Sequence, residues 1–129
     1  MDYKYSRNQV YLINYHLIWC PKRRRPVLIN KVKNKLEQII RQTAKEKNIE
    51  ILALEIQPDH LHLFISTYPT IAIHKLIKAF KGRSSNLLRK EFPELLKLPS
   101  LWTHSYFIST AGNVSNKTIQ KYIEQQSKI

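Results

Sequence analysis

The sequence predicts an α/β sandwich of the α+β type, in which one antiparallel sheet is covered by helices on one face. Two observations support this prediction. Short segments with apolar residues at every second position alternate with longer segments whose apolar residues recur every three or four positions. Their order is strand, helix, strand, strand, helix, strand, helix. The 129 residues provide the material of one domain, which we expect to span residues 1–129.

The first expected strand covers residues 10–19, which are apolar on both alternating faces, as in an inner strand of a sheet. Pro21 ends this strand, and residues 22–26 form a basic loop. Asn30 is a suitable N-cap for a helix that runs to about residue 47. The apolar stripe of this helix, which we expect to pack on the sheet, consists of Val32, Leu36, Ile39, Ile40 and Thr43.

A hairpin and a second helix are expected next. Residues 49–56 have the composition of a strand, and the turn at residues 57–59 leads directly into another strand that begins at His60. Such closely spaced strands most simply pair antiparallel. After Pro69, a helix over residues 71–90 has an apolar arc for the core and a basic arc on the opposite side.

The last part of the chain supplies a strand and a helix. Residues 92–105 are expected to form a loop, residues 106–110 a short strand, and residues 114–127 a helix capped by Asn113 or Ser115. A βαββαβ core with an added C-terminal helix is a ferredoxin-like sandwich, in which one face of the antiparallel sheet stays free for a ligand.

The charge of the chain indicates its class of partner. Lys and Arg number 22 against 9 for Asp and Glu, which gives a net charge of +13 and favours a polyanion such as nucleic acid. The single cysteine, Cys20, excludes an internal disulfide. With neither a signal peptide nor a membrane span expected, the sequence predicts a cytoplasmic protein without a membrane partner.

The motif His60-Leu61-His62 follows the predicted turn. Alternate residues of a strand point to the same face, so the two imidazoles are expected to point together while Leu61 faces the opposite way. Converging imidazoles are suitable ligands for a divalent cation. Because His-x-His also occurs by chance on solvated sheet faces, the motif alone leaves both interpretations open.

Tyr122 and Gln126 are four residues apart on the last expected helix and are therefore neighbours on one face. Two imidazoles and an amide oxygen leave coordination positions open for a phosphate oxygen. This donor set suits Mn²⁺, whereas Mg²⁺, which prefers oxygen ligands, binds more weakly. A phenol can attack a phosphate and later leave, so no nucleotide cofactor is required. The alternative is that Tyr122 only anchors its helix through the ring.

Several motifs occur together in a specific order. These are Tyr15-His16-Leu17-Ile18-Trp19, Lys22 to Pro26, Pro58 to Leu63, Lys81-Gly82-Arg83-Ser84-Ser85, Trp102 with Ser105-Tyr106-Phe107, and Gly112 to Ser115 ahead of Tyr122. Over about residues 8–126, the chain resembles the TnpA transposases, the small single-tyrosine HUH enzymes of bacterial and archaeal insertion sequences.

The resemblance implies an enzyme that cleaves and rejoins single-stranded DNA at the ends of an insertion sequence and recognises DNA hairpins there. It implies that Tyr122 forms a 5′-phosphotyrosine and that His60, His62 and Gln126 hold Mg²⁺ or Mn²⁺. It also implies a homodimer whose last helix moves at a hinge near Gly112 or is exchanged between subunits, and a nucleoid-associated protein of a bacterium or archaeon.

Two groups of basic residues are candidates for contacts with DNA phosphates, although either can instead be a solvated surface. They are Lys22, Arg23, Arg24 and Arg25 in the basic loop, and Lys78, Lys81, Arg83 and Arg89 on the second helix.

Other residues near these motifs have simpler interpretations. Asp59 can orient a histidine, but the favoured role is to shape the turn. Glu55 is as plausibly paired with a lysine as near a metal, and the aromatic residues Trp102, Tyr106 and Phe107 are favoured as core residues over base-stacking ones.

Two further functions stay open. One is a noncatalytic module that binds single-stranded nucleic acid, because the same architecture serves RNA-binding domains. The other is a domesticated HUH nicking enzyme with the same chemistry.

Overall fold

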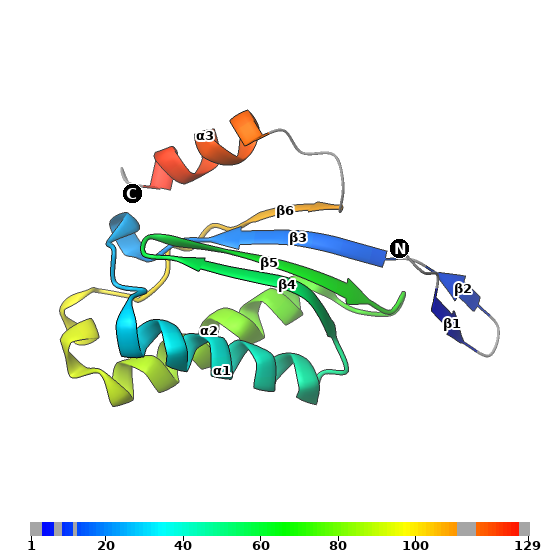
Figure 1. The fold of residues 1–129 in the computed structure, drawn as a ribbon, viewed down its shortest axis with the longest axis horizontal. Helices are drawn as coiled ribbons and strands as arrows, with labels where there is room; N and C mark the ends of the chain where they lie inside the picture. The colour runs from blue at the N-terminus through cyan, green and yellow to red at the C-terminus, as the bar shows by residue number, and fades with distance from the viewer. Residues whose placement is uncertain (1–3, 7–8, 12, 111–115, 127–129) are drawn as a thin grey trace.

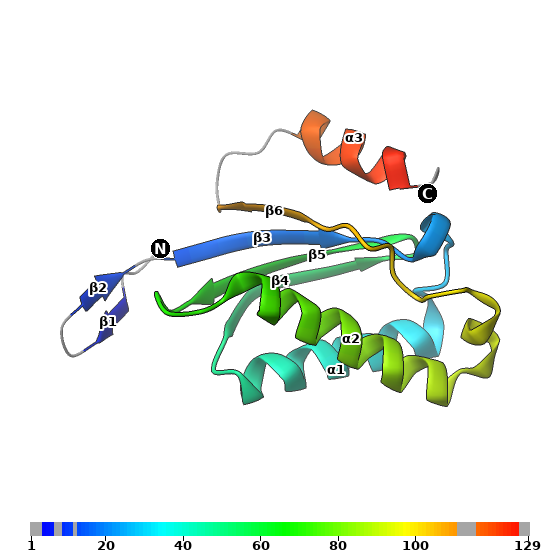
Figure 2. The same ribbon diagram turned by 180° about the vertical axis from the view of Figure 1, so that it is seen from behind.

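The computed structural model describes residues 4–6, 9–11, 13–110 and 116–126. A four-stranded antiparallel sheet has the strand order β4-β5-β3-β6, formed by Glu50–Gln57, His60–Thr67, Ile13–Trp19 and Phe107–Thr110. Helices α1 (Asn30–Glu46) and α2 (Ile73–Glu91) cover one face, and α3 (Asn116–Gln126) lies over the other (Figures 1 and 2). The predicted ferredoxin-like βαββαβ fold with an added C-terminal helix is confirmed.

The register of the inner strands determines which side chains share a face. β3 and β5 pair with Leu17 opposite Leu63 and Ile18 opposite His62. Opposite residues of an antiparallel pair point to the same side of the sheet. The odd-numbered residues of both strands therefore face α1 and α2, where the fully buried side chains are Leu17, Trp19, Leu61, Leu63 and Ile65. His60 and His62 point to the face over which α3 lies.

Helices α1 and α2 hold the core against this sheet. The stripe predicted for the first helix is buried, including its polar member Thr43, whose hydroxyl donates a hydrogen bond of 2.8 Å to the carbonyl of Ile39. The buried side chains of α2 are Leu76, Ile77, Phe80, Ser84 and Leu88. Neither helix, nor any other in the described part of the chain, is long and apolar enough to span a membrane.

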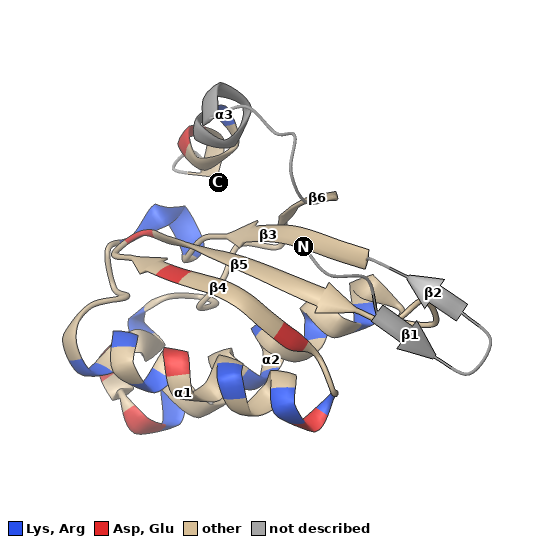
Figure 3. Cartoon of the chain, turned by 45° about the vertical axis from the view of Figure 1, so that its right-hand side comes forward, with Lys and Arg blue, Asp and Glu red and all other residues tan. Residues whose placement is uncertain are grey.

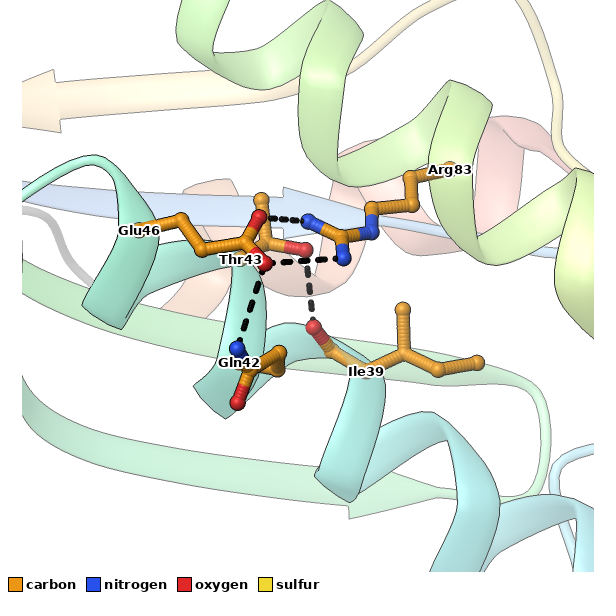
Figure 4. A network of polar contacts seen from close by, with 5 residues as sticks. All are labelled: Ile39, Gln42, Thr43, Glu46 and Arg83. Carbon is orange, nitrogen blue, oxygen red and sulfur yellow. Dashed lines mark hydrogen bonds and ion pairs between the residues drawn. The ribbon is translucent and has the colours of Figure 1, made fainter.

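A polar network joins α1 to α2 at the surface (Figure 4). The guanidinium of Arg83 donates to both carboxylate oxygens of Glu46, and Gln42 Nε2 donates to Oε1 of the same carboxylate at 3.1 Å. The hydrogen bond from Arg83 is the main reason why the pKa of Glu46 falls to about 2. Arg83, a predicted DNA contact, is therefore engaged in holding the two helices together.

Three kinds of local detail differ from the sequence prediction. Asn30 is not the N-cap of α1: that position is Ile29, which makes no capping hydrogen bond, and Asn30 itself adopts φ 53°, a conformation that Asn tolerates. The first strand is shorter than expected, because β1 (Lys4–Ser6) and β2 (Gln9–Tyr11) form a separate hairpin. Two predicted loops contain short 3₁₀ helices, η1 (Lys22–Arg24) and η2 (Pro93–Lys97). The expected caps at Asn113 and Ser115 and the hinge at Gly112 lie outside the described residues.

The central place of β5 predicts a large loss of stability when its core side is truncated. Leu63→Ala should lower the free energy of unfolding by about 2–5 kcal/mol, because the cavity left between two inner strands and the helices closes poorly. Urea denaturation measures this change. Leu96→Ala in η2 is the control, because Leu96 is 58% exposed and its truncation should change stability by no more than about 0.5 kcal/mol. Equal losses in the two variants would contradict the assigned register.

Candidate metal and tyrosine site

The two imidazoles of the His-x-His motif lie together on the α3 side of the sheet. Their ring centroids are 5.1 Å apart, with the rings at 78° to each other. His60 Nδ1 lies 2.8 Å from a carboxylate oxygen of Asp59, and His62 Nδ1 lies 2.9 Å from Nε2 of His16. Because each Nδ1 has a partner, the Nε2 atoms of both rings remain for a ligand.

The environment of His62 keeps its ring uncharged. Burial, together with the neighbouring His60 and His16, lowers the pKa of His62 to about 4, and Glu55 on β4 partly opposes this shift. At neutral pH the ring is therefore unprotonated, and one ring nitrogen has a lone pair for a cation.

The residues of this face fit a divalent cation with mixed ligands. Within the described part of the chain, no three His, Cys, Asp or Glu side chains converge on one point. The imidazole pair therefore needs an oxygen donor of another kind, such as an amide or the substrate itself. The predicted set of His60, His62 and Gln126 has this composition, and it stays a prediction.

Ser105 is the meeting point of Tyr122 and Gln126. Its hydroxyl donates to Oε1 of Gln126 at 2.8 Å and lies 3.2 Å from the hydroxyl of Tyr122. Since a serine has one proton to donate, the Tyr122 hydroxyl is the donor of the second bond. Nε2 of Gln126 donates to the Tyr122 carbonyl at 3.3 Å, which fixes the orientation of the amide. The predicted adjacency of Tyr122 and Gln126 is confirmed.

The phenol of Tyr122 is half-buried and remains protonated at neutral pH. Burial raises its pKa to about 12, an effect that its hydrogen bonds with the side chains of Ser105 and Thr103 partly oppose. The ring centroid lies 5.7 Å from that of Phe107 on β6, whose side chain faces the same side of the sheet. A nucleophilic role for Tyr122 therefore requires that its proton be lost when substrate binds.

Arg24 connects the histidine strand to α3. Its Nε lies 2.8 Å from the carboxylate of Asp59, which also contacts His60, and its Nη1 donates to the carbonyl of Ile123 on α3 at 3.4 Å. Asp59 thus contacts a predicted metal ligand as well as shaping the turn. In the same 3₁₀ turn, Arg23 is exposed, and the neighbouring Arg25 is exposed as well.

The structure brings the two halves of the predicted site to one face but not into contact. Among the described residues, the hydrogen bonds and ring contacts of His60 and His62 involve Asp59, His16 and each other. Those of Tyr122 and Gln126 involve Ser105, Thr103, Phe107 and α3 itself.

The basic residues of α2 are placed differently from those of η1. α2 lies on the far side of the sheet from α3, whereas η1 lies close to α3 at the end of the sheet (Figure 3). The ammonium of Lys81 donates to the carbonyls of Thr103 and Ser105 at 2.6 and 3.1 Å, and Arg89 donates to the Leu98 carbonyl at 3.0 Å. Lys78 is exposed. DNA contacts by Lys22 to Arg25 and by the α2 residues stay predictions.

Two residues of this face were missed from the sequence. The alternation of the first strand places His16 on the open face of the sheet. Its contact with His62, however, depends on the register between strands that are far apart in the chain. Ser105 lies in an irregular segment, where no periodicity shows which way a side chain points.

The fold and the site define a class: a basic ferredoxin-like domain with paired imidazoles on its open sheet face and a helix-borne tyrosine above that face. The family model described as "Transposase IS200 like" matches residues 9–126. The chain belongs to this family of transposases, enzymes that move DNA, as its motifs had indicated.

Individual relatives agree with this assignment. The chain is 39% identical to the ISDra2 transposase TnpA of Deinococcus radiodurans over 98% of its length and 92% of the relative's. A crystal structure of a transposase candidate from the same organism has a TM-score of 0.89 at 37% identity, with 95% of this chain and 97% of that one covered. A REP-associated tyrosine transposase bound to a REP hairpin, 16% identical over 94% of this chain and 68% of its own, shares the fold with a TM-score of 0.57.

The lowered pKa of His62 predicts a loss of stability in acid. The unfolded state binds a proton near the ordinary histidine pKa of 6.5, whereas the folded state binds it only near pH 4, so the free energy of unfolding falls as the pH drops through this window. Urea denaturation in the presence of a chelator at pH 7 and pH 5 measures the difference. His62→Gln should show a smaller difference than the wild type, and the control His74→Gln, at an exposed position of α2, should not. If His62→Gln showed the same pH dependence as the wild type, the lowered pKa would not belong to His62.

Proposed function

We propose that the protein cleaves and rejoins single-stranded DNA at the ends of an insertion sequence, with Tyr122 as the nucleophile and a divalent cation held by His60, His62 and Gln126. The observation that supports this most is the arrangement of the open sheet face: two imidazoles with free Nε2 atoms, below a helix that presents a phenol and an amide side by side.

The proposed reaction is a transesterification that balances without a cofactor. The deprotonated Tyr122 oxygen attacks the phosphorus of the scissile phosphate, and the bond from phosphorus to the 3′ oxygen breaks. The 3′ oxygen leaves with the electron pair and takes up a proton, while the 5′ phosphate remains esterified to Tyr122. In rejoining, a 3′-hydroxyl attacks this phosphotyrosine and the tyrosine leaves, so the energy of the bond is conserved.

The residues around the phosphate have distinct tasks in this proposal. The cation, Mn²⁺ or Mg²⁺, supplies Lewis-acid stabilisation of charge at the phosphate. Asp59 contacts His60, and Arg24 contacts both Asp59 and the carbonyl of Ile123. These two residues therefore position α3 relative to the histidine strand. Ser105 accepts a hydrogen bond from the Tyr122 hydroxyl and so orients the phenol before attack.

The proposed partners are DNA ends that form hairpins and a second copy of the chain. The net charge of +13 favours a polyanion, and a relative with the same fold has been solved bound to a REP hairpin. In the homodimer, α3 completes the site of its own subunit or of the partner. A domesticated nicking enzyme would use the same residues. It differs from the transposase of a mobile element only in the DNA that surrounds its gene.

Covalent trapping on single-stranded DNA tests the nucleophile. Incubation with a hairpin-containing strand that carries an element end and Mn²⁺ should give a protein–DNA adduct on denaturing gels. Tyr122→Phe should lower adduct formation by at least about 1,000-fold, because the ring without its oxygen cannot form the ester. The control Tyr68→Phe, at a position that packs against the core, should form the adduct as the wild type does.

The same assay separates the proposal from a noncatalytic binding module. EDTA and His60→Ala should abolish the adduct while leaving part of the DNA affinity. If Tyr122→Phe still formed the adduct, Tyr122 would be excluded as the nucleophile. DNA binding that is indifferent to EDTA and to His60→Ala, with no adduct from the wild type, would favour the binding module.

A further inference from the structure

His16 occupies a position on β3 that brings its ring to the edge of the histidine pair. In the β3–β5 register it stands opposite Phe64, one step along the same face from His62. Its ring stacks on Phe64 with centroids 4.0 Å apart and planes 13° apart, and it meets Phe107 edge-on at 6.4 Å. With 6% of its surface exposed, His16 has little room to change rotamer.

The contact from this ring to His62 joins two nitrogen atoms. His16 Nε2 lies 2.9 Å from His62 Nδ1, so one of the two must carry the proton. A neutral imidazole has one protonated nitrogen and one with a lone pair. If the proton were on Nε2 of His62, that atom could not ligate a cation. If the proton is on Nδ1 of His62, this nitrogen donates a hydrogen bond to His16, and Nε2 of His62 keeps its lone pair for a cation.

We propose that His16 is a positioning residue of the metal site, whose Nε2 accepts the Nδ1 proton of His62 and so holds His62 in the tautomer that binds a cation. This inference rests on the proposed function, because it requires a cation at His60 and His62. His16 then orients His62 in the same way as Asp59 orients His60, because each neighbouring side chain contacts the Nδ1 of the ligand ring.

A packing role for His16 makes a different prediction, and two substitutions separate the roles. His16→Phe keeps a flat ring that stacks on Phe64 but removes the acceptor. His16→Gln removes the ring but has an amide oxygen at about the reach of Nε2. If His16 acts as the acceptor, the Phe variant loses metal affinity and the Gln variant keeps it. If the ring matters only for packing, the order is reversed.

The experiment measures the dissociation constant for Mn²⁺ in the absence of DNA, by isothermal titration calorimetry, together with unfolding in urea. His16→Phe should weaken Mn²⁺ binding by about 10- to 100-fold, the usual effect of losing such a partner, while its fold is retained. His16→Gln should bind Mn²⁺ within about threefold of the wild type. If His16→Phe does not fold, His16→Leu takes its place with a smaller apolar side chain.

Wild-type affinity in a folded His16→Phe or His16→Leu variant would overturn the inference, and so would equal losses in the Phe and Gln variants. His62→Ala separates this failure from that of the proposed function. Should the wild type bind no Mn²⁺, or His62→Ala bind it as well as the wild type, the metal site itself is wrong and the inference falls with it.

Discussion

The register between β3 and β5 is the constraint on which the site depends. Side chains of a strand alternate between the two faces, so a slip by one residue would turn His60 and His62 toward the core and Leu61 and Leu63 toward the open face. Leu61, Leu63 and Ile65 are fully buried, and each contributes about 1.5–3 kcal/mol through burial, which a slipped sheet would forfeit. The apolar core on one face therefore fixes the direction of the imidazoles on the other.

The attachment of α3 is of a different kind. α1 and α2 bury continuous apolar stripes. The described residues of α3 are held by hydrogen bonds of the Tyr122 and Gln126 side chains at Ser105, by a hydrogen bond from Arg24 to the Ile123 carbonyl, and by the ring of Phe107. A typical hydrogen bond contributes only about 0.5–1.5 kcal/mol net. Lys81 fixes the Ser105 segment from beneath through two backbone carbonyls. Among the side chains that the structure describes, those on the Tyr122 side of the site are thus held mainly by polar contacts, whereas the histidine strand is held by its apolar core face, as suits a helix proposed to move.

The sequence was sufficient for the order of the elements, because period-two and period-3.6 patterns are local properties of the chain. It also showed that His60 and His62 share a face and that Tyr122 is adjacent to Gln126. The cap at Asn30 was wrong, since a residue favourable for capping adopted a left-handed backbone conformation instead.

What the sequence could not show depends on contacts between distant segments. The engagement of Arg83 with Glu46, and of Lys81 with the segment before β6, follows from helix packing that no local pattern encodes. The same holds for His16 and Ser105, whose neighbours are fixed by strand register and by an irregular segment. For Asp59 the sequence offered both a turn role and the orientation of a histidine and favoured the turn, and only the three-dimensional structure shows its contact with His60.

The central claim is that the amide of the last helix and the imidazole pair meet at one cation. Anomalous diffraction from crystals grown with Mn²⁺ and a single-stranded element end measures this directly. We predict one peak within coordination distance of Nε2 of His60, Nε2 of His62 and Oε1 of Gln126, with the amide supplied by the same subunit or by its partner. A peak bound by the imidazoles but remote from Gln126 in every copy, or a peak away from the imidazoles altogether, would contradict the account.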